Sequence, residues 1–141
     1  MTRVDFYVLR AGSRGNRYLL AARLAEKAWR SGHRVLLCVD DEETQRHMDR
    51  LLWTFRDVAF VPHGLIQQAE PRRNPVRIAI DQPDEEDDVL INLRSEVPPF
   101  FSRFERVAEC VDSDPQAREA GRARYRFYRE RGYPLHTHEV D

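Results

Sequence analysis

Residues 34–39 run Arg34-Val35-Leu36-Leu37-Cys38-Val39 and are apolar without interruption after the first position. Such a run is typical of a central strand in a parallel sheet, because that strand is covered on both faces. Gly32 stands just before the run and ends an apolar-rich helix that we place at about residues 17–30. A buried strand entered from a helix is the first sign of an alternating α/β arrangement.

The same alternation continues on both sides of this run. Five further strands are predicted from short apolar segments, at Val4–Leu9, Val58–Val61, Val76–Ile80, Val89–Leu93 and Arg106–Val111. Pro62 is expected to close the second of these, and polar loops are expected at residues 65–75 and in the acidic run 84–88.

Two more helices are predicted between or after these strands. Asp40 or Asp41 caps the first, which ends near Trp53, and Asp114 caps the second, which starts at Pro115 and ends at about residue 131, before a glycine. We therefore expect an open, mostly parallel α/β sheet with right-handed crossovers and helices on both faces.

Composition limits the classes of protein to which this chain can belong. With 141 residues and 41% hydrophobic content, we expect a single domain at residues 1–141. The 23 basic and 24 acidic residues nearly cancel, so the overall charge selects neither a polyanion nor a membrane. We see no signal segment and no apolar run near the ~18 residues of a membrane span, so we expect a cytoplasmic protein. Cys38 and Cys110 lie in apolar runs, which indicates buried free thiols.

An enzyme is the main alternative, because the loop after the first strand contains Gly12-Ser13-Arg14-Gly15 where nucleotide-binding α/β proteins carry a phosphate loop. A Walker loop needs Lys and then Ser or Thr after the second glycine, and here Asn16 and Arg17 follow. The dinucleotide fingerprint needs a glycine where Arg14 stands. Asp40 lies where a ribose-binding acid would be, but helix capping explains it equally well. A nucleotide-binding enzyme using Gly12–Gly15 remains the alternative.

No other motif predicts catalysis, a metal or a cofactor. The five histidines lack the H-E-x-x-H or paired-cysteine spacing of a zinc site. His136 and His138 offer two nitrogen ligands if the tail is extended, but a stable site generally needs a third or fourth. There is no Gly-x-Ser-x-Gly elbow, and neither cysteine has a nearby basic partner in the sequence, so covalent catalysis has no candidate. We therefore expect no catalytic residue, and we expect no cofactor.

The last predicted helix carries the most informative pattern. Between Pro115 and Arg131 it holds six arginines against two glutamates, a local net charge of about +4 on a nearly neutral chain. The helical repeat places four of the arginines and one aromatic ring on one side: Arg118, Arg122, Tyr125, Arg126 and Arg129. The opposite side carries mostly small residues that allow close packing on the sheet: Ala117, Ala120, Gly121 and Tyr128.

This arginine row has three interpretations. It is a solvated helix face, or a site for an anionic protein segment, or a direct contact to nucleic acid. Like charges four residues apart repel, so an uncompensated ladder of Arg118, Arg122 and Arg126 favours an anionic partner. The planar guanidinium group also suits carboxylates.

Several segments together resemble one family, the chi subunit of the bacterial DNA polymerase III holoenzyme. They are Val4-Asp5-Phe6-Tyr7-Val8-Leu9, Ala28-Trp29-Arg30-Ser31-Gly32-His33-Arg34-Val35-Leu36, Leu52-Trp53, Phe60-Val61-Pro62-His63 and Arg124-Tyr125-Arg126-Phe127-Tyr128-Arg129. The resemblance covers nearly the whole chain. It implies a nucleotide-binding-like α/β topology without a phosphate loop, and a non-catalytic adaptor of the clamp loader in DNA replication.

The resemblance also implies two protein partners, with DNA contacted only indirectly. One is the acidic C-terminal tail of single-stranded DNA-binding protein, which ends in proline-phenylalanine. The family's positions for that tail fall on Arg118, Arg122, Tyr125, Arg126 and Arg129, with Val111 and Thr137 beside them. The other partner is the psi subunit, whose region maps onto Trp53, Phe60, Val61, Pro62 and His63.

Overall fold

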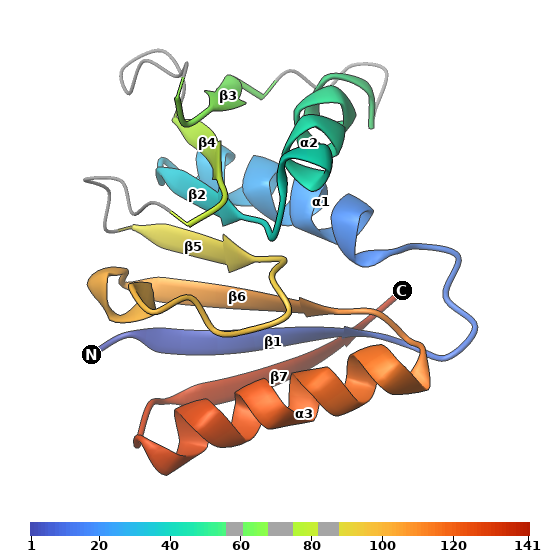
Figure 1. Ribbon diagram of the computed structural model, residues 1–141, viewed down its shortest axis with the longest axis vertical. Helices are drawn as coiled ribbons and strands as arrows, with labels where there is room; N and C mark the ends of the chain where they lie inside the picture. The colour runs from blue at the N-terminus through green and yellow to red at the C-terminus, as the bar shows by residue number, and fades with distance from the viewer. Residues whose placement is uncertain (56–60, 68–74, 82–87) are drawn as a thin grey trace.

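A computed structural model describes residues 1–55, 61–67, 75–81 and 88–141. Within these residues, seven strands form one sheet in the order β3-β4-β2-β5-β6-β1-β7, and all six strand pairings are parallel (Figure 1). The elements follow in chain order as β1 Arg3–Leu9, α1 Arg17–Arg30, β2 Val35–Cys38, α2 Glu42–Thr54, β3 His63–Leu65, β4 Val76–Ala79, β5 Val89–Asn92, a 3-10 turn η1 Phe101–Arg103, β6 Arg106–Val111, α3 Pro115–Glu130 and β7 Leu135–Val140.

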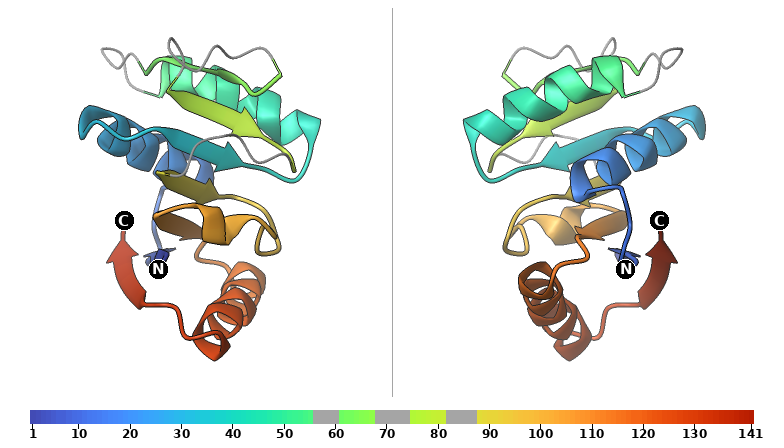
Figure 2. Two further views of the ribbon diagram at one scale, coloured as in Figure 1. Left: turned by 90° about the vertical axis from the view of Figure 1, so that its left-hand side faces the viewer. Right: turned by 90° about the vertical axis from the view of Figure 1, so that its right-hand side faces the viewer.

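Helices cover both faces of the sheet, as predicted (Figure 2). α1 and α2 pack on one face, and α3 and η1 pack on the other. The central strand β2 shows why, because Val35 and Leu37 join the apolar layer under α1 and α2, while Leu36 and Cys38 join the layer under α3. All four side chains are fully buried, so the apolar run at residues 34–39 is confirmed as an interior strand of a parallel sheet, covered on both faces.

The helix boundaries follow the expected capping chemistry. Asp41 is the N-cap of α2, where its carboxylate accepts a hydrogen bond from the Thr44 N–H at 2.8 Å. Asp114 caps α3 in the same way through the Ala117 N–H at 3.0 Å, and Pro115 occupies the first helical turn. Gly132 follows α3 with φ of +78°, a left-handed conformation that glycine adopts without steric cost.

The region around Pro62 differs from the prediction. Val61 and Pro62 lie outside any strand, and β3 begins directly after them and includes Leu65, which was expected to start a loop. The Pro62 carbonyl accepts a hydrogen bond from the Val76 N–H at 3.2 Å, so the proline leads into an edge strand, where its missing N–H costs no ladder bond. The rest of the predicted strand, the middle of the predicted loop and the acidic run at 84–87 lie outside the described residues.

The largest addition to the predicted fold is β7. Its residues, for which no strand was predicted, pair in parallel with β1 from Val4↔Leu135 to Leu9↔Val140. β1 therefore lies between β6 and β7, and α3 joins these two outer strands across one face of β1. This connection brings the arginine-rich helix and β7 to the same part of the sheet.

Candidate functional site

A hollow of about 170 Å³ lies between α3 and the strands β1, β6 and β7. We call it the α3 socket. Its lining is mostly apolar and aromatic, with two arginines, and consists of Phe6, Val8, Val111, Arg118, Gly121, Arg122, Tyr125 and Thr137. The structure therefore brings together five of the seven residues that the sequence analysis assigned to a tail-binding site. The lining also includes Phe6 and Val8 from β1, and no sequence pattern near α3 predicts that these two residues belong to the site.

Close packing of α3 on β6 shapes the floor of the socket. A β-carbon added at Gly121 would stand 3.1 Å from both methyl carbons of Val111, tighter than ordinary van der Waals contact. The missing side chain thus lets the helix approach the strand. One turn further along, Tyr125 meets Phe6 edge to face, with ring centroids 5.3 Å apart. The socket is consequently a space bounded by rigid aromatic and branched side chains.

The arginines of α3 differ in how freely they can reach a ligand. Arg118 donates from Nε to the Ser113 carbonyl at 3.0 Å and from Nη2 to the Leu9 carbonyl at 3.1 Å. Arg122 contacts the Glu119 carboxylate at 2.8 Å. The ladder of arginines is therefore not uncompensated, contrary to the sequence analysis. Arg126 and Arg129 are exposed, and neither side chain makes a hydrogen bond or ion pair with another described residue.

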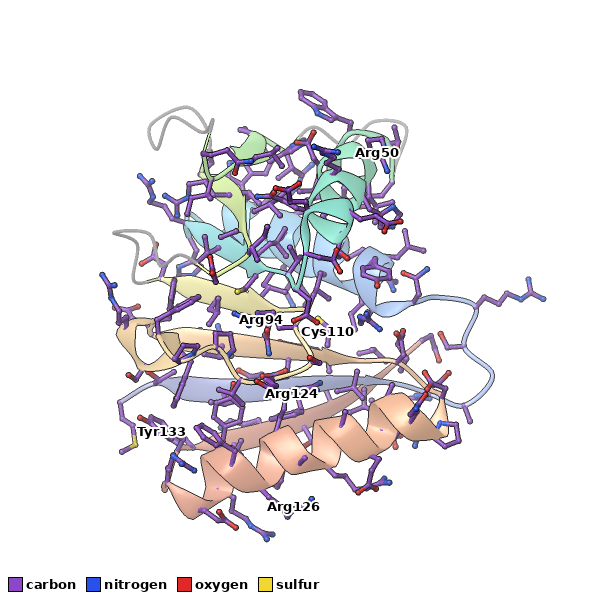
Figure 3. All side chains as sticks on the ribbon, in the orientation of Figure 1. Arg50, Arg94, Cys110, Arg124, Arg126 and Tyr133 are labelled. Atoms are coloured by element: carbon purple, nitrogen blue, oxygen red, sulfur yellow. The ribbon has the colours of Figure 1, made fainter. Side chains whose placement is uncertain are left out.

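Arg124, one of the six arginines in the charge count of the last helix, belongs to the interior. Its Nε lies 2.8 Å from Glu109 Oε1, and its Nη1 donates to the Ser95 carbonyl at 3.1 Å. Figure 3 shows Arg124 on the sheet side of α3 and Arg126 beyond the helix. The helical repeat contained this information, because Arg124 stands three residues after Gly121 and four before Tyr128, both of which are buried.

Glu109 is the centre of a buried polar network under α3. Besides Arg124, it accepts hydrogen bonds from the Tyr128 hydroxyl at 2.8 Å and from Asn92 Nδ2 at 3.0 and 3.1 Å. Burial raises the pKa of Glu109, and the Arg124 charge and these hydrogen bonds oppose the rise. The network thus anchors α3 from inside and positions its outer face.

The residues assigned to the psi contact are divided between surface and interior. Trp53, near the end of α2, is 53% exposed, and its ring lies 4.7 Å from that of His63, measured between centroids. Val61 and His63 are buried, and His63 contacts the Val61 carbonyl at 2.6 Å and the Asp49 carbonyl at 3.0 Å. Pro62 is half-buried, and Phe60 lies outside the described residues. Among the described residues of this region, Trp53 is therefore the main exposed apolar side chain.

The loop considered for nucleotide binding is engaged in local contacts. Ser13 Oγ accepts a hydrogen bond from the Gly15 N–H at 3.1 Å. Asp40, considered above for ribose binding, accepts a hydrogen bond from the Ser95 N–H at 3.0 Å and pairs with Arg94 at 3.4 Å. These contacts connect the loop after β2 with the loop after β5. Within the described part of the chain, no group of three or more His, Cys, Asp or Glu side chains is placed to hold a metal ion.

Both cysteines are buried free thiols, as predicted. Burial raises the pKa of Cys38 to about 11 and raises that of Cys110 further, so both side chains are neutral thiols near neutral pH. Among the described helices, none has both the length and the apolar character needed to cross a bilayer.

Comparison with known proteins agrees over almost the full length of the chain. The family model described as DNA polymerase III chi subunit, HolC, matches residues 1–136. The DNA polymerase III subunit chi of Pseudomonas aeruginosa is 46% identical over 141 residues, covering 99% of this chain and 98% of the relative. The subunit chi of Escherichia coli (strain K12) is 34% identical over 120 residues, 84% of this chain and 82% of the relative.

A third relative, the DNA polymerase III subunit chi of Haemophilus influenzae, is 31% identical over 138 residues and covers 96% of both chains. The family model's match includes β1, β6, α3, the α2–β3 region and the first two residues of β7, and it therefore covers every residue that lines the socket except Thr137. The parallel α/β sheet formed by the described residues also agrees with the fold that the resemblance implies. The chain belongs to the DNA polymerase III chi subunit family.

Proposed function

We propose that this protein is a non-catalytic adaptor that acts in the cytoplasm and links the clamp loader of DNA polymerase III to single-stranded DNA-binding protein. In this proposal the α3 socket binds the acidic C-terminal tail of single-stranded DNA-binding protein, and the region around Trp53 binds the psi subunit. DNA is reached only through these partners. The observation that carries the proposal is the apolar hollow bordered by Arg118 and Arg122.

The socket has the chemistry for a ring-terminated acidic chain end. A terminal phenylalanine ring would pack among Phe6, Val111 and Tyr125, while its carboxylate meets Arg122 at the rim. Upstream aspartates would lie near Arg126 and Arg129, the two exposed arginines of the row. Arg118 would act mainly through its charge, because two of its nitrogens donate to backbone carbonyls.

The expected affinity is moderate. Burying the ring contributes roughly 1.5–3 kcal/mol, and each exposed ion pair adds only ~0.2–1 kcal/mol. After the cost of association, we expect a binding free energy on the order of -8 kcal/mol, which corresponds to a Kd around micromolar. Binding should weaken at high salt. Such an affinity suits a tether that is released and captured again.

The psi contact is proposed on different grounds. Trp53 presents a large, partly exposed ring, held against His63 within its own fold. Buried aromatic anchors tend to dominate the energetics of protein interfaces, and Trp is among the commonest of them. Val61 and His63 would support this surface from below, since both are buried.

Fluorescence anisotropy tests the tail site directly. A labelled acidic peptide ending in proline-phenylalanine is titrated with the protein, and the same peptide without its final phenylalanine serves as the ligand control. Arg122→Ala and Tyr125→Ala should each weaken binding several-fold or more, whereas Arg50→Ala, which removes an exposed charge from α2, should not. Arg122→Ala should leave Tm nearly unchanged, and Tyr125→Ala should lower it modestly because its ring contact with Phe6 is lost. Wild-type affinity in both α3 variants would contradict the assigned site.

A further inference from the structure

Glu119 lies at the rim of the α3 socket and is one of two acids on α3. Its Oε2 is 2.8 Å from Arg122 Nη2, and the two side chains are 68% and 60% exposed. Arg122 lines the socket, and Glu119 does not. The acid therefore reaches from outside onto an arginine that a ligand in the socket would also need.

Arg122 is the socket arginine with the most freedom to reach a ligand. The other socket arginine, Arg118, is tied by two hydrogen bonds to the carbonyls of Ser113 and Leu9. Breaking these bonds for a ligand would leave two carbonyl groups without their donors, which is costly where water is partly excluded. The carboxylate of Glu119 therefore pairs with Arg122, which is the socket arginine that a ligand carboxylate can bind with the lower free-energy cost.

The charge environment of Glu119 agrees with this competition. A hydrogen bond from Arg122, together with the positive charges of Arg122 and Arg126, lowers the pKa of Glu119. The carboxylate is consequently ionised at neutral pH. It both occupies Arg122 and repels other carboxylates that approach the same rim.

We propose that Glu119 is an internal competitor that weakens the binding of acidic chain ends to the α3 socket and so sets their release. This inference rests on the proposed function of the socket. An acidic ligand must displace Glu119 from Arg122 or share the arginine with it, and in either case part of the ion-pair energy is lost. A single weak acid gains little from the exchange, whereas a segment with several carboxylates also engages Arg126 and Arg129 and can displace it.

A matched pair of variants isolates this effect. Glu119→Gln removes the competing charge and keeps the side-chain size, and Glu130→Gln makes the same change at the exposed end of α3, eleven residues further along the helix. Anisotropy with a labelled peptide of three aspartates followed by proline-phenylalanine measures Kd for both. From the usual strength of exposed ion pairs, we expect Glu119→Gln to lower Kd by about 1.5- to 5-fold at low salt, and Glu130→Gln to lower it by less than about 1.5-fold.

Salt and a second substitution sharpen the test. The gain from Glu119→Gln should shrink at about 0.5 M salt, because screening weakens the competing pair and the repulsion together. In an Arg122→Gln background, Glu119→Gln should lose most of its effect, because the arginine for which the two carboxylates compete is gone. Equal Tm values for the variants and the wild type show that the fold is retained.

The outcomes separate the two proposals. If the wild type binds the peptide and Glu119→Gln binds it with the same or lower affinity, the competition is disproved while the socket assignment stands. If Glu119→Gln and Glu130→Gln tighten binding equally, the effect is one of general charge, and the inference also fails. If no form of the protein binds the peptide, the proposed tail site itself is wrong.

Discussion

The α3 socket and the Trp53 region are two very different surfaces on one sheet. The socket is a hollow under a row of arginines, and its shape depends on Gly121 lying against Val111. In the Trp53 region, the described residues present one largely exposed ring, that of Trp53, and its neighbours Val61 and His63 are buried in the fold. The first surface suits a short, charged chain end, and the second suits a partner that buries an aromatic ring over a broad contact.

In both surfaces, a buried polar contact lies beneath the exposed side chains that are proposed to bind a partner. On α3 the exposed arginines are available for binding because a separate arginine, Arg124, neutralises the buried Glu109 beneath them. Near Trp53 the polar group that supports the ring, His63, is itself held by two backbone carbonyls. In both regions an inner polar contact fixes an outer side chain.

Removing the inner contact of α3 should produce the largest effect. Arg124→Met would leave Glu109 buried without its ion-pair partner, and losses of about 3–5 kcal/mol are typical of such a change. Urea unfolding followed by circular dichroism measures the loss. Arg126→Met removes an exposed arginine from the same helix and should change the free energy of unfolding by less than about 0.5 kcal/mol. Similar losses in both variants would contradict the division between inner and outer arginines.

The next largest effect separates the two partners. Trp53→Ala should weaken binding of the psi subunit by about 2 kcal/mol or more, roughly 30-fold, because it removes the proposed aromatic anchor. The same variant should bind the acidic tail peptide like the wild type, and Tyr125→Ala should show the reverse pattern. Calorimetry with psi and anisotropy with the peptide measure the two affinities. A loss of both activities in either variant would show that the surfaces are not independent.

Salt should affect the two surfaces unequally. Raising the ionic strength from about 0.05 to 0.5 M screens exposed charges, so tail-peptide affinity should fall several-fold. Binding of psi through Trp53 depends mainly on apolar burial and should change by less than about twofold. If both affinities, measured in the same buffers, fall equally with salt, the proposed difference between a charge-dependent tail site and an apolar psi contact is wrong.

The smallest expected effect concerns the β7 side of the socket. Thr137 is exposed at the rim, on the face of β7 that borders the hollow. Thr137→Val keeps the branched shape and removes a hydroxyl that is exposed to water, so tail-peptide affinity should change by less than about twofold. A larger loss of affinity in the same anisotropy assay would show that the Thr137 hydroxyl contacts the peptide, so that β7 supplies a polar group to the site.

Much of the fold is visible in the sequence because its strands are buried on both faces. The predicted boundaries of α1 and β6 match the structure, and the apolar pattern of β2 identified an interior strand of the sheet. β7 was missed because it is a half-exposed edge strand of polar residues, with no continuous apolar run to mark it. β3 was misplaced because it is short, contains Gly64 and follows a proline.

The candidate site was only partly predictable. Local periodicity places Arg122, Tyr125 and Arg126 on α3, but the socket also needs Phe6 and Val8, more than 100 residues earlier in the chain. No local pattern reports such a contact, because it arises from the order of the strands in the sheet. The roles of these residues in binding stay a prediction.

The position of β1 has a consequence for biosynthesis. Both of its neighbours, β6 and β7, are formed by the last third of the sequence, so the first strand to leave the ribosome cannot form its backbone pairs until nearly all of the chain has been made. Long-range parallel pairings of this kind raise the contact order and slow folding. Until then, Val4 and Phe6 lack the late part of the apolar layer that buries them, including Phe101, Val107 and Tyr128. Apolar surface that stays exposed in this way during synthesis favours aggregation.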